Sequence, residues 1–272
     1  MTLQDIRQAL DTFDVALFEA RKNQAKQSRK LIDERAMILQ PKLAKLFFRQ
    51  SDHLLKSLKK FKIEFRESVV SEFDQVFDDA ILPTSAEMWE VLEKAIIAAL
   101  KRGAQQMITI FNVETVFSLT DPLAEEYIKA VGANLITGID NTTKDQIRAI
   151  ILTAIENGTS YSELAVQIKR KYNQFAVGVP QKHLRSRAEL IAVTEIGNAY
   201  CEGNRIEALS IQRAGIPMEK YWYTTGDDRV SEGCAANQAQ GWIPLQDTYA
   251  SGHQRPLRFP GCRCVEMYRR MK

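Results

Sequence analysis

Apolar residues recur at steps of three and four over most of the first 180 residues, a spacing typical of helices. The first such segment runs from Leu3 to Leu39, and we expect Pro41 to interrupt it. Residues 21–30 are almost entirely polar, so this part of the helix is expected to be exposed or packed on another element. A second apolar stripe, over residues 43–77, is long enough for a helical hairpin or a coiled-coil-like contact.

Capping residues predict where further helices begin. A Ser or Thr followed three residues later by Glu or Gln forms a capping box, and Asp followed by Pro is also typical of a first turn. The predicted starts are Thr84 with Glu87, Asp121 before Pro122, Thr143 with Gln146, and Ser160 with Glu163. Gly158 suits the left-handed residue that ends a helix, so the two helices flanking it are expected to form a hairpin.

The pattern changes after residue 181, where a helix over about residues 183–214 precedes a loop-rich region. Residues 220–225, KYWYTT, are β-prone, and residues 262–268, CRCVEMY, are expected to form a strand that pairs with residues 221–223. The chain is therefore expected to be mostly α, with a long helical N-terminal stem followed by a small C-terminal α+β domain. We divide it into a stem or arm over residues 1–140, a helical hairpin over 141–180 and the α+β domain over 181–272.

The composition is ordinary for a globular protein, with 45% hydrophobic and 26% charged residues among 272. No apolar run approaches the roughly 18 residues that a membrane span needs, and the N-terminus has acidic residues where a signal peptide would be basic. Membrane anchoring and secretion are therefore not expected. Four cysteines are too few for a disulfide framework in a chain of this length, which leaves metal binding or simple burial as their expected uses.

The net charge of +3 hides an uneven distribution. Residues 1–66 carry 15 Lys and Arg against 8 Asp and Glu, residues 67–180 carry 9 against 16, and residues 181–272 carry 13 against 10. The basic segment could contact phosphate or an acidic partner, or its cations could simply solvate the outside of long helices. The candidate contact residues are Arg21, Lys22, Lys26, Arg29, Lys30, Lys59, Lys60 and Lys62.

Residues that could carry chemistry all follow residue 185. On a helix, Thr194, Glu195 and Asn198 share one face with Glu202 among apolar neighbours, so their polar groups need partners. Glu195 could accept hydrogen bonds from backbone amides or from Arg229 and so fix a neighbouring segment. It could instead act as a general base, and the residues alone leave both interpretations open.

Two further clusters follow. The sequence TTGDDRV, with Asp227, Asp228 and Arg229, could bind a cation or a phosphate, or could form a tight turn. Three thiols and one imidazole could hold a metal, and buried free thiols are the alternative. These residues are Cys234, Cys262, Cys264 and His253.

Taken in order, these clusters resemble the phage head morphogenesis family, the Mu F-like and SPP1-type minor head proteins of tailed bacteriophages. The resemblance covers about residues 140–268, and residues 1–130 are similar only in helical character. The residues that carry it are Arg187-Ala188, Ile191–Glu195, Asn198, Ala199, Trp222, Thr224, Asp227–Val230, Cys234 and Cys262–Cys264.

The resemblance implies a low-copy virion protein inside the head near the portal, made in the host cytoplasm and acting in head assembly and genome packaging or delivery. Its implied partners are the portal protein, other head proteins and the phage genome, contacted without sequence preference, and no membrane. Many relatives carry a pattern that resembles a zinc site, but Ser231 and Phe259 stand here at two of its positions. The expectation is therefore no cofactor, with zinc as the alternative.

Two other classes of function remain as rivals. An enzyme related to ADP-ribosyltransferases would use Glu195 together with residues 227–229, whereas the family resemblance implies no catalytic turnover. A non-specific DNA-binding module would depend on the basic residues of the N-terminal segment. No motif for reading base sequence is present, so contact with the phosphate backbone is the expected mode.

Overall fold

The computed structural model describes residues 3–60, 69–177 and 186–271 and divides into two compact units. The first unit comprises Met1–Arg35, Ala98–Ser118 and Val193–Lys272, and the second comprises Ala36–Ile97 and Leu119–Ala192. The described helices are α1 (Leu3–Lys60), α2 (Val69–Phe111), α3 (Pro122–Glu156), α4 (Tyr161–Val177), α5 (Arg187–Arg213) and α6 (Glu232–Ala239). None of these helices is long and apolar enough to cross a membrane.

The fold is mostly α with one small sheet, as predicted, but the units are not consecutive segments of the chain. Helices α1, α2 and α5 each contribute residues to both units. The predicted segments 1–140, 141–180 and 181–272 therefore differ from these units, because each long helix packs its two ends among different neighbours.

Several predicted helix boundaries are confirmed. Asp121 caps α3 by accepting a hydrogen bond from the Leu123 N–H at 2.9 Å, and Pro122 is the first residue of that helix. Ser160 and Glu163 form the expected capping box before α4, with the Ser160 N–H donating to Glu163 at 3.1 Å. Gly158 has a φ of 60°, in the left-handed region between the two helices.

The boundaries predicted at Pro41, Thr84 and Thr143 are wrong, because the helices continue through them. The Thr84 hydroxyl donates to the Ile81 carbonyl at 2.7 Å and that of Thr143 to the Ile139 carbonyl at 2.8 Å, as hydroxyls do inside helices. Proline within a helix costs about 3 kcal/mol. Fully buried neighbours of Pro41, such as Leu43, offset this cost by packing.

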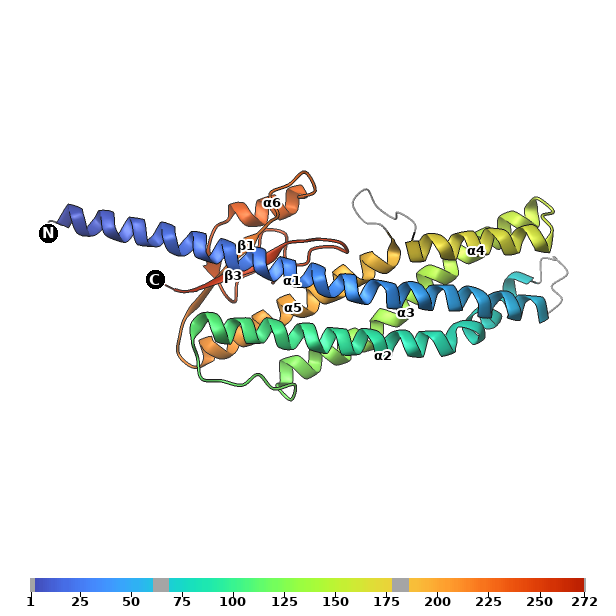
Figure 1. Cartoon of the computed structure of the whole chain (residues 1–272), viewed down its shortest axis with the longest axis horizontal. Coiled ribbons are helices and arrows are strands. Elements are labelled where there is room, and N and C mark those ends of the chain that lie inside the picture. Colours follow the sequence, from blue (N-terminus) through green and yellow to red (C-terminus); the bar gives the residue numbers. More distant parts are fainter. Residues whose placement is uncertain (1–2, 61–68, 178–185, 272) are drawn as a thin grey trace. The chain divides into compact units, whose positions relative to one another are not determined.

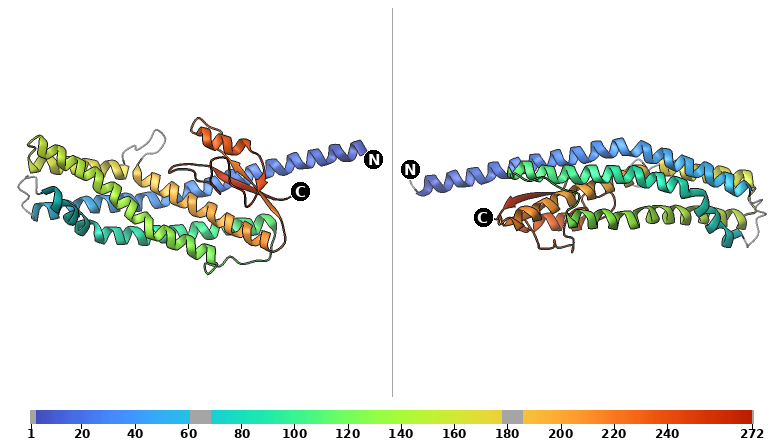
Figure 2. Two further views of the ribbon diagram at one scale, coloured as in Figure 1. Left: turned by 180° about the vertical axis from the view of Figure 1, so that it is seen from behind. Right: turned by 90° about the horizontal axis from the view of Figure 1, so that it is seen from below.

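The second unit is a bundle of helix segments, and two views show α3 and α4 lying beside each other (Figures 1 and 2). Its core includes Phe47 and Phe175, whose ring centroids lie 5.7 Å apart. The Arg187 guanidinium lies over the Phe175 ring at 5.0 Å and donates to the Thr143 hydroxyl and the Ile139 carbonyl, each at 2.9 Å. Arg187 therefore joins the start of α5 to α3.

The first unit contains the sheet, with strands β1 (Met218–Tyr223), β2 (Ile243–Pro244) and β3 (Val265–Arg270) in the order β2-β1-β3. Both pairings are antiparallel, and Tyr221 lies opposite Met267, which confirms the predicted pairing. The first half of α1 passes across this sheet (Figure 1). Arg21 Nε donates to the Tyr268 carbonyl at 3.1 Å, and the Phe18 and Tyr221 rings meet edge to face at 5.7 Å.

Two glycines allow α2 and α5 to touch within the first unit. A Cβ atom on Gly103 would lie 2.1 Å from the Tyr200 carbonyl oxygen, and one on Gly203 would lie 2.0 Å from that of Leu100. Both neighbours are backbone atoms, which cannot move aside as a flexible side chain would. This crossing therefore requires glycine on both helices.

We predict that Gly203→Ala lowers the free energy of unfolding by about 1–3 kcal/mol, because the methyl group forces the helices apart. Gly138 on α3 is the matched control, since a Cβ there meets nothing within 4 Å. Gly138→Ala should raise stability by about 0.5–1 kcal/mol through helix propensity. Chemical unfolding measures both, and equal responses of the two variants would contradict the crossing.

Candidate functional site

The polar face of α5 holds the loop that follows residue 253. Thr194 Oγ1 accepts a hydrogen bond from the Gly261 N–H at 3.0 Å. One turn further along, Asn198 Oδ1 accepts from Arg255 at 3.2 Å and from the Leu257 N–H at 3.5 Å. These side chains are four residues apart and therefore project from one face of α5 to contact the loop.

The next turn of α5 adds a charge to this contact. Glu202 is 8% exposed and forms ion pairs with Arg255 from the loop and with Arg205 from α5, the latter at 3.0 Å. The sequence placed Glu202 on this face, but nothing in it identified Arg255 as a partner because 53 residues separate them. The ion pair and the Asn198 bond together fix the start of the loop.

Glu195 lies beside these residues and is mostly buried. Burial raises the pKa of its carboxyl to about 7, although the positive charge of Arg255 acts in the opposite direction. Arg229, one of its expected partners, instead donates to Asp227 at 2.9 Å. A pKa of about 7 would allow Glu195 either to transfer a proton or to remain protonated as a buried carboxyl.

The TTGDDRV segment forms a turn, which was the simpler of its two interpretations. Asp227 accepts hydrogen bonds from the Thr225 hydroxyl at 2.8 Å and from the Arg229 N–H at 3.2 Å. Although partial burial opposes it, the contacts with Arg229 and Thr225 hold the pKa of Asp227 at about 2. Gly226 has a φ of 71°, and Asp228 is exposed at the tip of the turn.

Trp222 is a core residue of the first unit. It is fully buried, and its ring meets that of Tyr249 edge to face at 5.0 Å. The same apolar cluster contains Cys234, Cys262 and Cys264. Trp222 therefore packs in the same buried cluster as the three thiols.

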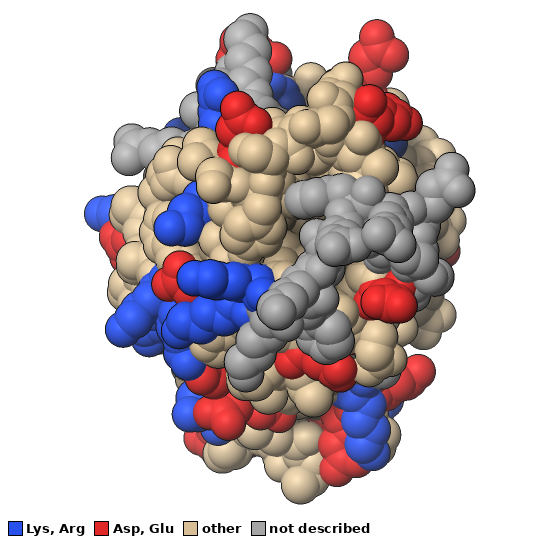
Figure 3. Space-filling view, turned by 90° about the vertical axis from the view of Figure 1, so that its right-hand side faces the viewer, with Lys and Arg blue, Asp and Glu red and all other residues tan. Residues whose placement is uncertain are grey.

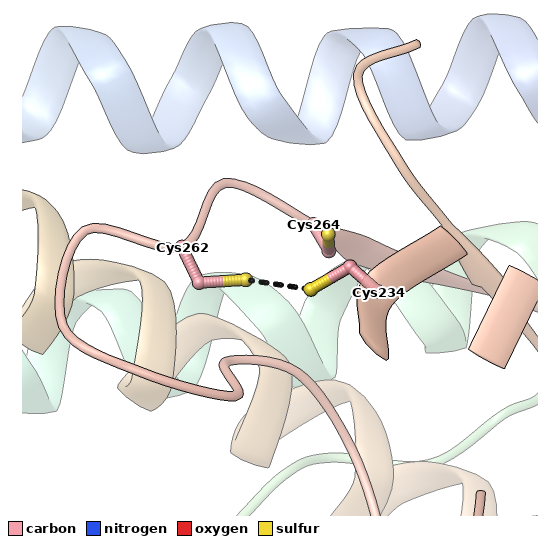
Figure 4. Close-up of side chains that lie close together, drawn as sticks. All are labelled: Cys234, Cys262 and Cys264. Carbon is pink, nitrogen blue, oxygen red and sulfur yellow. Dashed lines mark hydrogen bonds between the residues drawn. The ribbon is translucent and has the colours of Figure 1, made fainter. Parts of the chain in front are cut away.

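The three predicted thiols come together, as Figure 4 shows. Cys234 lies on α6, Cys262 in the loop and Cys264 just before β3, and their sulfur atoms all lie within 4.8 Å of one another. The sulfurs of Cys234 and Cys262 are 3.8 Å apart. Contact among the sulfurs lowers the pKa of Cys234 and raises those of Cys262 and Cys264.

Zinc binds thiolate sulfur at about 2.3 Å in a tetrahedron, whose edge is then about 3.8 Å. The distance between the sulfurs of Cys234 and Cys262 matches that edge, and the sulfur of Cys264 lies within 4.8 Å of both. His253 does not belong to this group, and its Nδ1 lies 3.0 Å from both the hydroxyl and the carbonyl of Ser251. Among the described residues, no fourth Cys, His, Asp or Glu belongs to this group.

Ser231 and Phe259, the two residues that differ from the expected zinc-site pattern, make other contacts. Ser231 caps α6 and accepts a hydrogen bond from Arg258 at 3.3 Å. The Arg258 guanidinium also lies over the Phe259 ring, 5.2 Å from its centre. Neither residue supplies a strong zinc ligand, so the fourth position would need a donor from outside the group.

The predicted basic contact residues do not form a single group. Arg21, Lys22, Lys26, Arg29 and Lys30 belong to the first unit and Lys59 to the second. The side chain of Lys60 and all of Lys62 lie outside the described residues. The face in Figure 3 carries both signs, with Lys and Arg clustered on one side of it.

Sequence reasoning missed a buried polar network in the sheet. Lys220, which is 1% exposed, donates to the Gln254 carbonyl at 2.6 Å, and Glu266 accepts from the hydroxyls of Tyr249 at 3.1 Å and Tyr268 at 2.5 Å. Burial raises the pKa of Glu266 and lowers that of Lys220. Strand alternation could have revealed Lys220, because it shares the buried face of β1 with Trp222.

We predict that Glu195→Gln stabilises the protein at pH 8 and has little effect near pH 4.5. The folded state holds its proton up to a pKa of about 7, above the usual 4.5, so ionisation disfavours folding as pH rises between these values. Gln avoids that cost, which is on the order of 3 kcal/mol. Thermal unfolding across pH measures it.

The exposed Glu90 on α2 supplies the control, since Glu90→Gln changes a side chain at the surface and should leave the melting temperature nearly unchanged. A Glu195→Gln protein that melts below the wild type at pH 8 would show that the ionised carboxylate is needed for folding.

A family match covers the part of the chain that carries these motifs. Residues 145–267 match the family described as phage Mu protein F like protein. No curated protein and no solved structure matches the chain. The matched segment includes all of α5, the turn at Asp227 and the three thiols of the first unit. Residues 145–267 are therefore similar to the phage Mu protein F-like family, and this match supports a phage head morphogenesis protein.

Proposed function

We propose that this protein is a minor head protein of a tailed bacteriophage that is present in few copies near the portal and acts without catalytic turnover. The family match over residues 145–267 is the observation that carries the proposal. A head protein implies a place in the virion and contacts with other head proteins. Association with the portal, genome packaging or delivery, and contact with the genome are the further parts of the proposal.

The geometry of the motif residues favours a structural role for them. Thr194 and Asn198 bind the loop backbone, Asp227 closes a turn and Trp222 is buried in the core. Catalytic residues have to reach a substrate, whereas these four are engaged within the first unit. The motif therefore maintains the fold of this unit.

The enzyme hypothesis rests on the raised pKa of Glu195. A general base loses its reaction when it becomes Gln, whereas a buried structural carboxyl that is already protonated does not need its charge. Phage that carry Glu195→Gln should therefore form plaques as the wild type does. Loss of plaques with normal head assembly would instead favour catalysis.

We predict that quantitative mass spectrometry finds this chain in purified phage particles in far fewer copies than the major capsid protein. A portal-associated protein has only one vertex to occupy, which limits its number. A phage protein made only during infection serves as the control for contamination. Abundance in infected cells combined with absence from particles would contradict the proposal.

Zinc binding by the three thiols is a separate proposal, which the 3.8 Å sulfur spacing supports. Zinc would join α6, the loop and the start of β3. We expect about one equivalent of zinc in the purified protein and a lower melting temperature after chelation. Cys264→Ser should remove the metal, and Cys201→Ser, which changes a buried thiol outside the group, should retain it. A metal-free protein that folds normally would refute zinc binding.

A further inference from the structure

A basic hollow lies within the first unit between α1 and the edge of the sheet. Its volume is about 150 Å³, several times the roughly 30 Å³ that one water molecule takes up in the liquid. A phosphate group fits in this space. The residues that line it are Ala25, Lys26, Arg29, Tyr223, Thr224, Thr225, Arg263 and Val265.

The lining of the hollow contains three cations and no carboxylate. Lys26 and Arg29 project from adjacent turns of α1, and Arg263 comes from the segment before β3. Arg263 lies between Cys262 and Cys264, whose side chains are both buried. This places a cation from each end of the chain around the same space.

The cations are only partly neutralised by the protein. Asp33 pairs with Arg263 at 2.7 Å and with Arg29 at 3.8 Å, so two guanidiniums share one carboxylate. Arg263 Nε is buried without a hydrogen-bond partner. Burial and the charge of Arg263 lower the pKa of Arg29 to about 10, although nearby acidic groups act in the opposite direction.

We propose that this hollow binds a phosphate group and that the group belongs to the backbone of the phage genome. Guanidiniums and ammonium groups are the side chains that bind phosphate in proteins. The site rests on the proposed function, which brings the protein close to packaged DNA. Free inorganic phosphate offers the same chemistry, so the experiment has to separate the two sources.

The surroundings of the hollow favour DNA over a small anion. Arg21 and Lys22 lie one turn before Lys26 on α1 and add two further cations, of which Lys22 pairs with Glu19 at 2.7 Å. Arg21 and Arg269 also lie over the Trp242 ring, at 5.8 and 4.5 Å. A row of cations can neutralise successive phosphates of one polymer, and contact of this kind is independent of base sequence.

The test measures binding of the full chain to a short labelled DNA duplex by fluorescence anisotropy at several salt concentrations. The double variant Lys26→Gln/Arg29→Gln removes two of the cations. Lys101→Gln/Arg102→Gln removes the same two residue types from exposed positions of α2 in the same unit and is the matched control. Thermal unfolding verifies that both proteins fold.

We expect Lys26→Gln/Arg29→Gln to weaken DNA binding at least tenfold and to reduce the salt slope by about 2, since each phosphate contact contributes about 0.9. The control should bind as the wild type does. Asp33→Asn, which removes the shared carboxylate, should tighten binding, so the proposal stays testable even if the double variant does not fold.

Equal losses in the double variant and its control would overturn the site, because only diffuse charge would then matter. Binding of inorganic phosphate, detected by calorimetry, together with unchanged DNA binding in the double variant would overturn the assignment to DNA. A protein that is present in particles but has no affinity for DNA would refute this site while leaving the proposed head function intact. Removal of residues 1–66 is a poor substitute for these variants, because α1 packs on the sheet through Arg21.

Discussion

The ion pair between Glu202 and Arg255 is the interaction on which the rest of the first unit depends. Removing charges from water is costly, and a mostly buried pair is stable only when further hydrogen bonds complete it. Arg255 supplies them by donating to Asn198 and to the Pro256 carbonyl. The pair thereby holds the start of a loop that has no regular secondary structure of its own and that leads to Cys262 and Cys264.

This loop makes the thiol group dependent on α5. Thr194 holds the Gly261 backbone, so the residue next to Cys262 is fixed to the helix. Cys234 comes from α6, whose start is set by the Ser231 cap. The sulfurs therefore meet because two separate anchors, one on α5 and one at Ser231, place their backbones. Their proximity therefore does not require a metal to explain it.

The sequence predicted the features that depend on neighbouring residues. The caps at Asp121 and Ser160, the stop at Gly158 and the alternation of β1 all arise within a few residues of the chain. The wrong helix starts predicted at Thr84 and Thr143 also came from neighbouring residues alone. A capping box describes a helix end only when the backbone before it leaves the helix, and packing within the second unit keeps both segments helical.

The candidate site was predictable in its residue types and not in its pairings. The spacing of Thr194, Asn198 and Glu202 correctly indicated a polar face in need of partners, but Arg255 and Gly261 lie more than 50 residues away. Arg229 was one of two partners considered for Glu195, the other being backbone amides. The Arg229 guanidinium instead donates to Asp227, because a contact between residues two positions apart orders little additional chain.

The same limit applies to the basic N-terminal segment. Its excess of Lys and Arg is a property of the sequence, whereas its candidate residues divide between two units. Positive charge gathers at the hollow because Arg263 joins Arg29 there. Arg263 follows Arg29 by 234 positions in the sequence, and both pair with Asp33. A count of charges along the chain could not show that pairing. The anion site follows from tertiary structure, and its strength depends on how little of that charge Asp33 neutralises.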